Sequence, residues 1–278
     1  MNIREMNLQD AERLAELSLL VGWNQTLEDC RFLIESPWCK MICVEENGEV
    51  IGTAGAPVYD DMGFINMVIV HPDYRKRGIA TAMIRHFLDT VKVKTFRLHA
   101  TPAGSFVYSK IGFTTTRTMS YFVAKETAFP AGKADIQPAT PADLDAIAAM
   151  DFKNSGMNRK LLLENNFKRF GRFALKIEDK GKLAAFLLGR RGRKQRQIAA
   201  VETADGNWEN AFALIGAAMP MEKELPSNII FFDADKNAIK QAEKCGMVRV
   251  RELIEMEYGV PGTPPGAGYH AIYGGDFG

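Results

Sequence analysis

The stretch HPDYRKRGIATAM, residues 71–83, connects a basic loop directly to the start of a helix. Three cations stand just before Gly78, and an apolar pattern of helical period begins at Ile79. The first N–H groups of a helix lack carbonyl partners and carry partial positive charge, and glycine lets an anion approach the main chain closely. The stretch therefore predicts an anion-binding helix N-terminus, with a solvated basic turn as the alternative.

Regular patterns surround this loop. Asn7 and Thr26 stand where helix N-caps are expected, and Asn47-Gly48 predicts the turn of a β-hairpin. We expect strands at 2–6, on both sides of the Asn47-Gly48 turn, and at 63–70, 95–100 and 114–125, with helices after Asn7, from Thr26 to Leu33, and at 79–91 and 104–113.

The pattern of the opening residues returns in the second half of the chain. Residues 3–17 resemble 136–150, and 110–113 resemble 244–247. Such self-similarity predicts two copies of one α/β unit. We expect domains at 1–130 and 131–278, a linker at Pro130–Gly132, and an irregular tail rich in Gly and Pro.

Composition narrows the class of protein. Hydrophobic residues make up 46% of the 278 residues and charged residues 25%, as in an ordinary globular chain. The net charge of +1 gives no global field for nucleic acid or an anionic membrane, so we expect neither as a partner. Four cysteines without a pairing framework indicate reduced thiols in a cytoplasmic protein, and we expect no metal site, no exported leader and no membrane span.

The loop lacks the endings of two familiar phosphate loops, the Walker motif and the dinucleotide fingerprint. Strand 63–70 followed by Arg75-x-x-Gly78-x-Ala80 at a helix start resembles the GNAT superfamily of acyl-CoA-dependent N-acetyltransferases. The segment YSKIGF, residues 108–113, is similar to a second pattern of that family. The resemblance covers residues 3–125 and implies an α+β fold, with two GNAT-like units that each have a mixed, mostly antiparallel twisted sheet flanked by helices.

The resemblance also implies an acetyl-CoA site in the first copy. The diphosphate would lie on the loop and helix start, and the pantetheine arm would pair with the main chain of the preceding strand. The implied cofactor-binding residues are Val68, Ile69, Val70, Arg75, Lys76, Arg77, Gly78, Ile79, Ala80 and Thr81.

Three further positions are candidates for chemistry or acceptor binding. Tyr108 stands where the family often carries the acid that protonates the thiolate, with a packed tyrosine as the alternative. His99 stands where some relatives place a carboxylate, and is a candidate base or a surface or structural histidine. Trp23-Asn24 is similar to a segment that borders the acceptor pocket in tandem GNAT proteins; a buried Trp and a helix-breaking Asn are the alternative.

The second copy lacks the loop motif. A constant offset between the copies aligns Arg75 with Glu209, Gly78 with Phe212 and Tyr108 with Ala242. We therefore expect only the first copy to bind acetyl-CoA, and the second to shape the acceptor pocket or a dimer surface. The basic stretch GRRGRKQRQ, residues 189–197, is interpreted as a hairpin turn, with RNA binding as the alternative.

The expected function is transfer of acetyl from acetyl-CoA to a primary amine, directly in a ternary complex. The alternative is a non-catalytic acyl-CoA-binding sensor or adaptor. A small-molecule acceptor is favoured over a protein, a homodimer is possible, and the sequence names neither the acceptor nor the oligomeric state.

Overall fold

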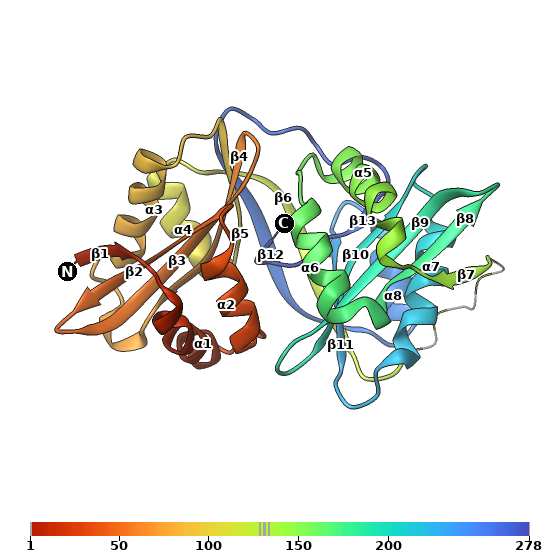
Figure 1. Ribbon diagram of the computed structural model, residues 1–278, viewed down its shortest axis with the longest axis horizontal. Coiled ribbons are helices and arrows are strands. Elements are labelled where there is room, and N and C mark those ends of the chain that lie inside the picture. The colour runs from red at the N-terminus through yellow and green to blue at the C-terminus, as the bar shows by residue number, and fades with distance from the viewer. Residues whose placement is uncertain (1, 128, 130–131, 133, 278) are drawn as a thin grey trace. The chain divides into compact units, whose positions relative to one another are not determined.

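The computed structural model describes residues 2–127, 129, 132 and 134–277, which form two compact units (Figure 1). Unit 1 comprises Met1–Thr116, Ile254–Gly262 and Gly275–Phe277. Unit 2 comprises Arg117–Leu253 and Thr263–Gly274. Each unit is an α+β structure with a mixed, mostly antiparallel sheet, which confirms the expected fold class.

Unit 1 contains the elements expected for the first copy. Asn7 and Thr26 each form a capping box, with Asp10 and Asp29 respectively, and Asn47 and Gly48 take the left-handed conformation that the hairpin turn requires. In chain order the elements are β1 (Asn2–Glu5), α1 (Ala11–Leu20), α2 (Leu27–Glu35), β2 (Cys39–Glu46), β3 (Glu49–Tyr59), β4 (Met62–Val70), α3 (Ile79–Thr90), β5 (Thr95–Ala100) and α4 (Pro102–Ile111).

The sheet of unit 1 has the order β1-β2-β3-β4-β5-β12. Its neighbours are antiparallel except for β4 and β5, which run parallel. One buried cluster includes Ile84 and Phe87 of α3 together with Ile65, Phe96 and Leu98 of the sheet. Helix α3 is therefore held against the strands that follow and precede it, which fixes the place of its N-terminus.

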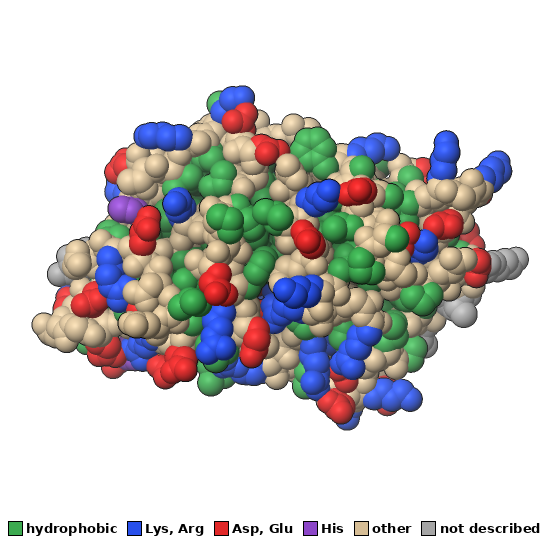
Figure 2. Space-filling view, in the orientation of Figure 1, with side chains coloured by type: hydrophobic (Ala, Val, Ile, Leu, Met, Phe, Trp, Pro, Cys, Tyr) green, Lys and Arg blue, Asp and Glu red, His purple; other side chains and the backbone are tan. Residues whose placement is uncertain are grey.

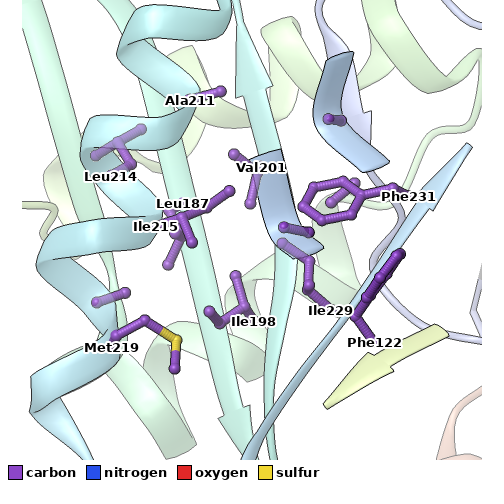
Figure 3. Close-up of a cluster of buried hydrophobic side chains, with 14 of the residues drawn as sticks. Phe122, Leu187, Ile198, Val201, Ala211, Leu214, Ile215, Met219, Ile229 and Phe231 are labelled. Atoms are coloured by element: carbon purple, nitrogen blue, oxygen red, sulfur yellow. The ribbon is translucent and has the colours of Figure 1, made fainter. Parts of the chain in front are cut away.

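Unit 2 repeats this order of elements. They are β7 (Ile136–Pro138), α5 (Leu144–Ser155), α6 (Lys160–Phe170), β8 (Leu175–Asp179), β9 (Lys182–Arg191), β10 (Arg196–Thr203), α7 (Trp208–Ala218), β11 (Ser227–Phe232), α8 (Lys236–Lys244) and β13 (Tyr269–Ala271). The sheet order is β6-β11-β13-β10-β9-β8-β7. Figure 3 shows its core, where Leu214 and Ile215 of α7 face Leu187, Ile198 and Val201 of the sheet.

Two strands are divided between the units. Strand β6 (Thr114–Ala124) follows the first copy, yet its residues Met119–Ala124 pair with β11 of unit 2. Strand β12 (Val248–Gly259) ends the second copy, yet Ile254–Gly259 pair with β5 of unit 1. The compact units thus exchange strands relative to the two sequence copies. The proposed junction of those copies at residues 130–131 lies outside the described residues.

No helix among the described residues combines the length and the apolar character needed to cross a bilayer. Lys/Arg and Asp/Glu side chains are interspersed on the face shown in Figure 2. This mixture of charges matches the small net charge of the sequence.

Candidate functional site

The basic loop ends at a helix N-terminus that no side chain caps. Gly78 is the N-cap residue of α3, with a φ of 77°, and it makes no side-chain hydrogen bond to the helix. A Cβ built on Gly78 would meet nothing within 4 Å, and the first turn of α3 contains no acidic residue. The N–H groups of Ile79, Ala80 and Thr81 have no carbonyl partner within the helix.

The three cations of the loop are not equivalent. Arg77 forms a two-pronged ion pair with Glu46, with Nη2 to Oε2 at 2.6 Å, and its guanidinium lies over the ring of Tyr74. The hydrogen bond from Arg77 lowers the pKa of Glu46. Arg75 Nε donates to the carbonyl of Val70 at 3.3 Å. In the described chain no carboxylate forms an ion pair with Arg75 or Lys76, so these two cations are the better placed to meet an anion.

Strands β4 and β5 separate beside this loop. Their parallel pairing runs from Met62–Ile65 with Thr95–Leu98 and stops there. A register shift against β3 follows, Met67 takes a φ of 47°, and Thr53 Oγ1 donates to the Met67 carbonyl at 3.0 Å. Among the described residues no strand pairs with the β5-facing edge of β4 beyond Ile65. The predicted pantetheine residues Val68, Ile69 and Val70 lie on this separated stretch.

Tyr108 lies in the last turns of α4, before the left-handed C-cap Gly112. Its ring contacts Phe113 with centroids 6.0 Å apart, and it packs against the same buried cluster as α3. Burial raises the pKa of Tyr108 to about 12, although the residue as a whole is half-buried. The phenol is therefore protonated at neutral pH, as an acid must be, and within the described protein its hydroxyl has no hydrogen-bond partner.

His99 is the first residue of β5 beyond the end of the parallel pairing. Phe96, Leu98 and Ala100 point into the core, so His99 lies on the opposite face of the strand, as the alternation predicts. The side chain is only 1% exposed and meets Phe64 edge to face, with ring centroids 5.0 Å apart. The interpretation as a surface histidine is therefore wrong. No bulge is needed for His99 to share a face with Arg97, because the β5–β12 register is continuous.

Sequence reasoning missed the carboxylates that face His99 and Arg97. Glu255 and Glu257 of β12 stand directly opposite these two residues. Arg97 Nη2 lies 2.6 Å from Glu257 Oε1, and His99 Nε2 lies 3.4 Å from Glu255 Oε2. The available signal was the alternation Arg97-x-His99 in one strand and Glu255-x-Glu257 in another, but nothing local indicated that these strands pair.

The predicted acceptor residues Trp23 and Asn24 are half-buried in the loop between α1 and α2. Their neighbour Gln25 is buried and donates to Asp276 Oδ2 at 3.0 Å. The carbonyl of Asp276 in turn accepts from Asn66 Nδ2 of β4. The segment Gly275–Phe277 is thus bonded to unit 1 on the face of β4 that carries Asn66, a contact that the sequence did not suggest.

Unit 2 repeats the separated strands but fills the space between them. Strands β10 and β11 pair in parallel only at Arg196–Gln197 with Ser227–Asn228. A register shift in β10 follows, as in β4. Strand β13 then enters between them, with Ala271 opposite both Val201 of β10 and Phe231 of β11. In unit 2 main chain from the C-terminal tail therefore pairs with both strands, whereas in unit 1 no strand among the described residues pairs with the β5-facing edge of β4 beyond Ile65.

The helix start in unit 2 is also closed. Asn207 is the N-cap of α7, and its side chain accepts from the N–H groups of Glu209 and Asn210. The caps therefore align Gly78 with Asn207, so the expected alignments of Gly78 with Phe212 and of Arg75 with Glu209 are wrong. The loop before α7 is shorter than a constant offset assumes.

The place of Tyr108 in unit 2 is taken by a buried alanine. The bond from Phe113 N to the Tyr108 carbonyl has its counterpart between Met247 N and Ala242. These matching helix ends align Tyr108 with Ala242, which is fully buried, as the sequence comparison expected.

The basic stretch 189–197 forms a hairpin, as the first of the two interpretations expected. Gly192 N donates to the Gln195 carbonyl in its turn. Arg190 and Arg196 are buried and bond to Gln197 and Ser227, and Arg191 pairs with Glu222 and Glu224.

The four cysteines are free and buried. In the part of the chain that the structure describes, no group of His, Cys, Asp and Glu has the arrangement of a metal site.

Residues 8–113 match the model of the acetyltransferase (GNAT) family. This segment contains the separated strands, the uncapped helix start and Tyr108, and it forms a domain of the GNAT family, as the loop motif predicted. The whole chain has the two-unit fold of a tandem GNAT protein.

Solved structures share this fold over nearly all of the chain. A putative acetyltransferase from Pyrococcus horikoshii has a TM-score of 0.80 at 18% identity, covering 100% of this chain and 95% of that one. A tandem GNAT protein from the clavulanic acid biosynthesis pathway has a TM-score of 0.66 at 13% identity, covering 94% and 99%. A GCN5-related N-acetyltransferase from Sphaerobacter thermophilus has a TM-score of 0.64 at 14% identity, covering 95% and 97%.

Among curated proteins, cysteine-rich protein 2-binding protein from Mus musculus is 38% identical over 64 residues. The match spans 22% of this chain and only 8% of the mouse protein. It is thus a likeness to a small part of a much longer protein.

Proposed function

We propose that unit 1 is an acetyl-CoA-dependent N-acetyltransferase that moves acetyl to a primary amine directly, within a ternary complex. The observation that carries the proposal is the contrast between two similar frameworks. In unit 1 the strands are separated and the helix start is uncapped, whereas in unit 2 strand β13 fills the gap and Asn207 caps the helix. Membership of residues 8–113 in the GNAT family supports the same function.

The residues of unit 1 fit the two parts of acetyl-CoA. The N–H groups from Gly78 to Thr81 would hold the diphosphate, with Arg75 and Lys76 beside it, while Val68 to Val70 would pair with the pantetheine amides. A hydrogen bond to a charged group contributes about 1.5–3 kcal/mol, so three or four together give roughly micromolar affinity. Arg77 contributes less in this proposal because Glu46 already pairs with it.

The chemistry follows from the groups around the separated strands. The acceptor arrives as an ammonium ion and gives one proton to a base, for which His99 is our candidate. The amine nitrogen then bonds to the thioester carbonyl carbon, and a main-chain N–H near Val68 stabilises the oxyanion. The C–S bond breaks, Tyr108 protonates the sulfur, and the second proton lost by the nitrogen restores the phenol.

The acceptor of this proposal is a small-molecule primary amine rather than a protein. We place the reaction in the cytoplasm, because the buried free cysteines suit a reducing compartment. The proposal includes no metal ion.

The experiment is to incubate the purified chain with acetyl-CoA and a panel of amino acids, polyamines, amino sugars and N-terminal peptides, and to follow release of free CoA thiol. Turnover on at least one amine supports the enzyme. Tight binding of acetyl-CoA without turnover on any amine contradicts it and favours the alternative, an acyl-CoA sensor or adaptor.

A further inference from the structure

We infer that Glu255, supplied by strand β12, orients His99 and stabilises its protonated form, so that the last strand of the second copy completes the catalytic site of the first. The inference rests on the proposed function and deepens it by assigning a positioning residue for the base. The juxtaposition that carries it is the directly opposed pair His99–Glu255, at the point where β4 and β5 separate.

The geometry holds the imidazole in one orientation. Phe64 meets the ring edge to face on one side, and Glu255 Oε2 lies 3.4 Å from Nε2. This distance is longer than an ideal hydrogen bond, and apo forms of catalytic sites commonly show such long bonds. The side chains of His99 and Glu255 are only 1% and 4% exposed, so water scarcely screens their interaction.

The carboxylate is itself fixed in place. Thr116 Oγ1 donates to Glu255 Oε1 at 2.8 Å, which leaves Oε2 directed toward the imidazole. Arg97 lies farther away, 3.7 Å from Glu255 Oε1, and bonds instead to Glu257. Glu257 also accepts from Gly262 N at 3.0 Å. Glu257 thus bonds to Arg97 and to Gly262 N, whereas Glu255 Oε2 lies beside His99.

The charges around the imidazole favour a proton on it. The carboxylate of Glu255 lies beside the imidazole, and Arg97, which bonds to Glu257, lies 3.7 Å from the other oxygen of Glu255. With Nε2–H donated to Glu255, the buried atom Nδ1 is the ring nitrogen left to take up a proton. The carboxylate then neutralises the imidazolium, as the aspartate of a Ser-His-Asp triad does.

The test compares Glu255→Gln with the matched variant Glu257→Gln, which alters a buried carboxylate of the same strand that faces Arg97. Urea denaturation first establishes that both variants fold. Nitrogen-15 NMR of the histidine rings then reports the tautomer of His99 without any acceptor. We expect the Nε2–H form in the native protein and in Glu257→Gln, and a loss of that single form in Glu255→Gln.

Kinetics use acetyl-CoA and an amine that the native chain acetylates. In Glu255→Gln we expect kcat to fall about 100-fold, and the acidic limb of the kcat/KM profile to move to lower pH, because no carboxylate stabilises the imidazolium. Glu257→Gln should move the acidic limb less than Glu255→Gln does, because Glu257 bonds to Arg97 and not to the imidazole. If Glu255→Gln keeps the native tautomer and the native pH profile, the inference is wrong.

Two further outcomes, a variant that does not fold and a protein that does not bind acetyl-CoA, can be distinguished from a failure of the inference itself. If Glu255→Gln fails to fold, Thr116→Val removes the hydroxyl that fixes the carboxylate and should give a smaller change in the same direction; an unchanged tautomer and profile would overturn the inference. If acetyl-CoA does not bind at all, the proposed function fails, while a changed tautomer still shows that Glu255 orients His99.

Discussion

Single residues differ in how well the sequence predicted them. Gly78 and Tyr108 lie in short local motifs, so their spacing made them candidates, and the structure places Gly78 at an uncapped helix start and Tyr108 where burial raises its pKa to about 12. Glu255 is 156 positions from His99 in the chain and meets it only through strand pairing. Local patterns carry no information on such a pairing, so this carboxylate could not be predicted.

At this scale Tyr108→Phe tests the proposed acid. The substitution removes only the hydroxyl, so acetyl-CoA affinity should be kept, while kcat should fall about 100-fold because the leaving thiolate is no longer protonated. The raised pKa, about 12, keeps the phenol protonated in alkaline solution. We therefore expect no loss of native kcat from Tyr108 between about pH 8 and pH 10. Equal kcat in both proteins by the thiol-release assay would remove Tyr108 from the mechanism.

At the scale of elements, the sequence predicted strands, helices and caps well because each depends on neighbours in the chain. It did not predict β13, a strand of three residues within a segment rich in Gly and Pro. That strand forms only because β10 and β11 offer two unpaired edges. Pairing with these two strand edges therefore outweighs the weak β propensity of the segment itself.

Because strand β13 contains a buried histidine, we expect the stability of unit 2 to depend on acid pH. His270 is buried there, 4.1 Å from the Trp208 ring between centroids, with Nε2 2.8 Å from Thr203 Oγ1. Burial lowers the pKa of His270 from 6.5 to about 4, so below pH 6.5 the unfolded chain takes up a proton that the folded chain refuses. The free energy of unfolding should therefore fall as the pH drops from about 6.5 to about 4, by roughly 3 kcal/mol in all.

Urea denaturation of the native chain and of His270→Gln measures the contribution of His270 to the pH dependence of the free energy of unfolding. Glutamine stays neutral at every pH, and the other titratable groups contribute equally in the two proteins. The free energy of unfolding of the native chain minus that of His270→Gln should fall by roughly 3 kcal/mol between about pH 6.5 and pH 4. A difference that is constant between about pH 7 and pH 4 would contradict the buried, neutral state of His270.

At the scale of the whole molecule, the two compact units do not coincide with the two sequence copies. Unit 1 needs Ile254–Gly262, because without Glu257 the buried Arg97 lacks its ion-pair partner and β5 becomes an open edge. An uncompensated buried charge costs about 3–5 kcal/mol, which is a large share of the stability of a domain.

We therefore expect the isolated fragment 1–130 to be unfolded or aggregated, and co-expression with fragment 131–278 to restore a soluble complex. Circular dichroism and size-exclusion chromatography measure both outcomes. The control is the full chain cut once at the junction, which should stay associated. A fragment 1–130 that folds cooperatively alone would contradict the need for β12.

The central claim is that the N-terminus of α3 in unit 1, and not that of α7, holds the diphosphate of acetyl-CoA. Calorimetric titration of the full chain with acetyl-CoA tests it directly, together with Gly78→Asp and its neutral match Gly78→Asn, which both tolerate the left-handed backbone. We predict one site per chain, at least a 100-fold loss of affinity in Gly78→Asp because its carboxylate repels the diphosphate, and a smaller loss in Gly78→Asn. Two sites per chain, or native affinity in Gly78→Asp, would contradict the account.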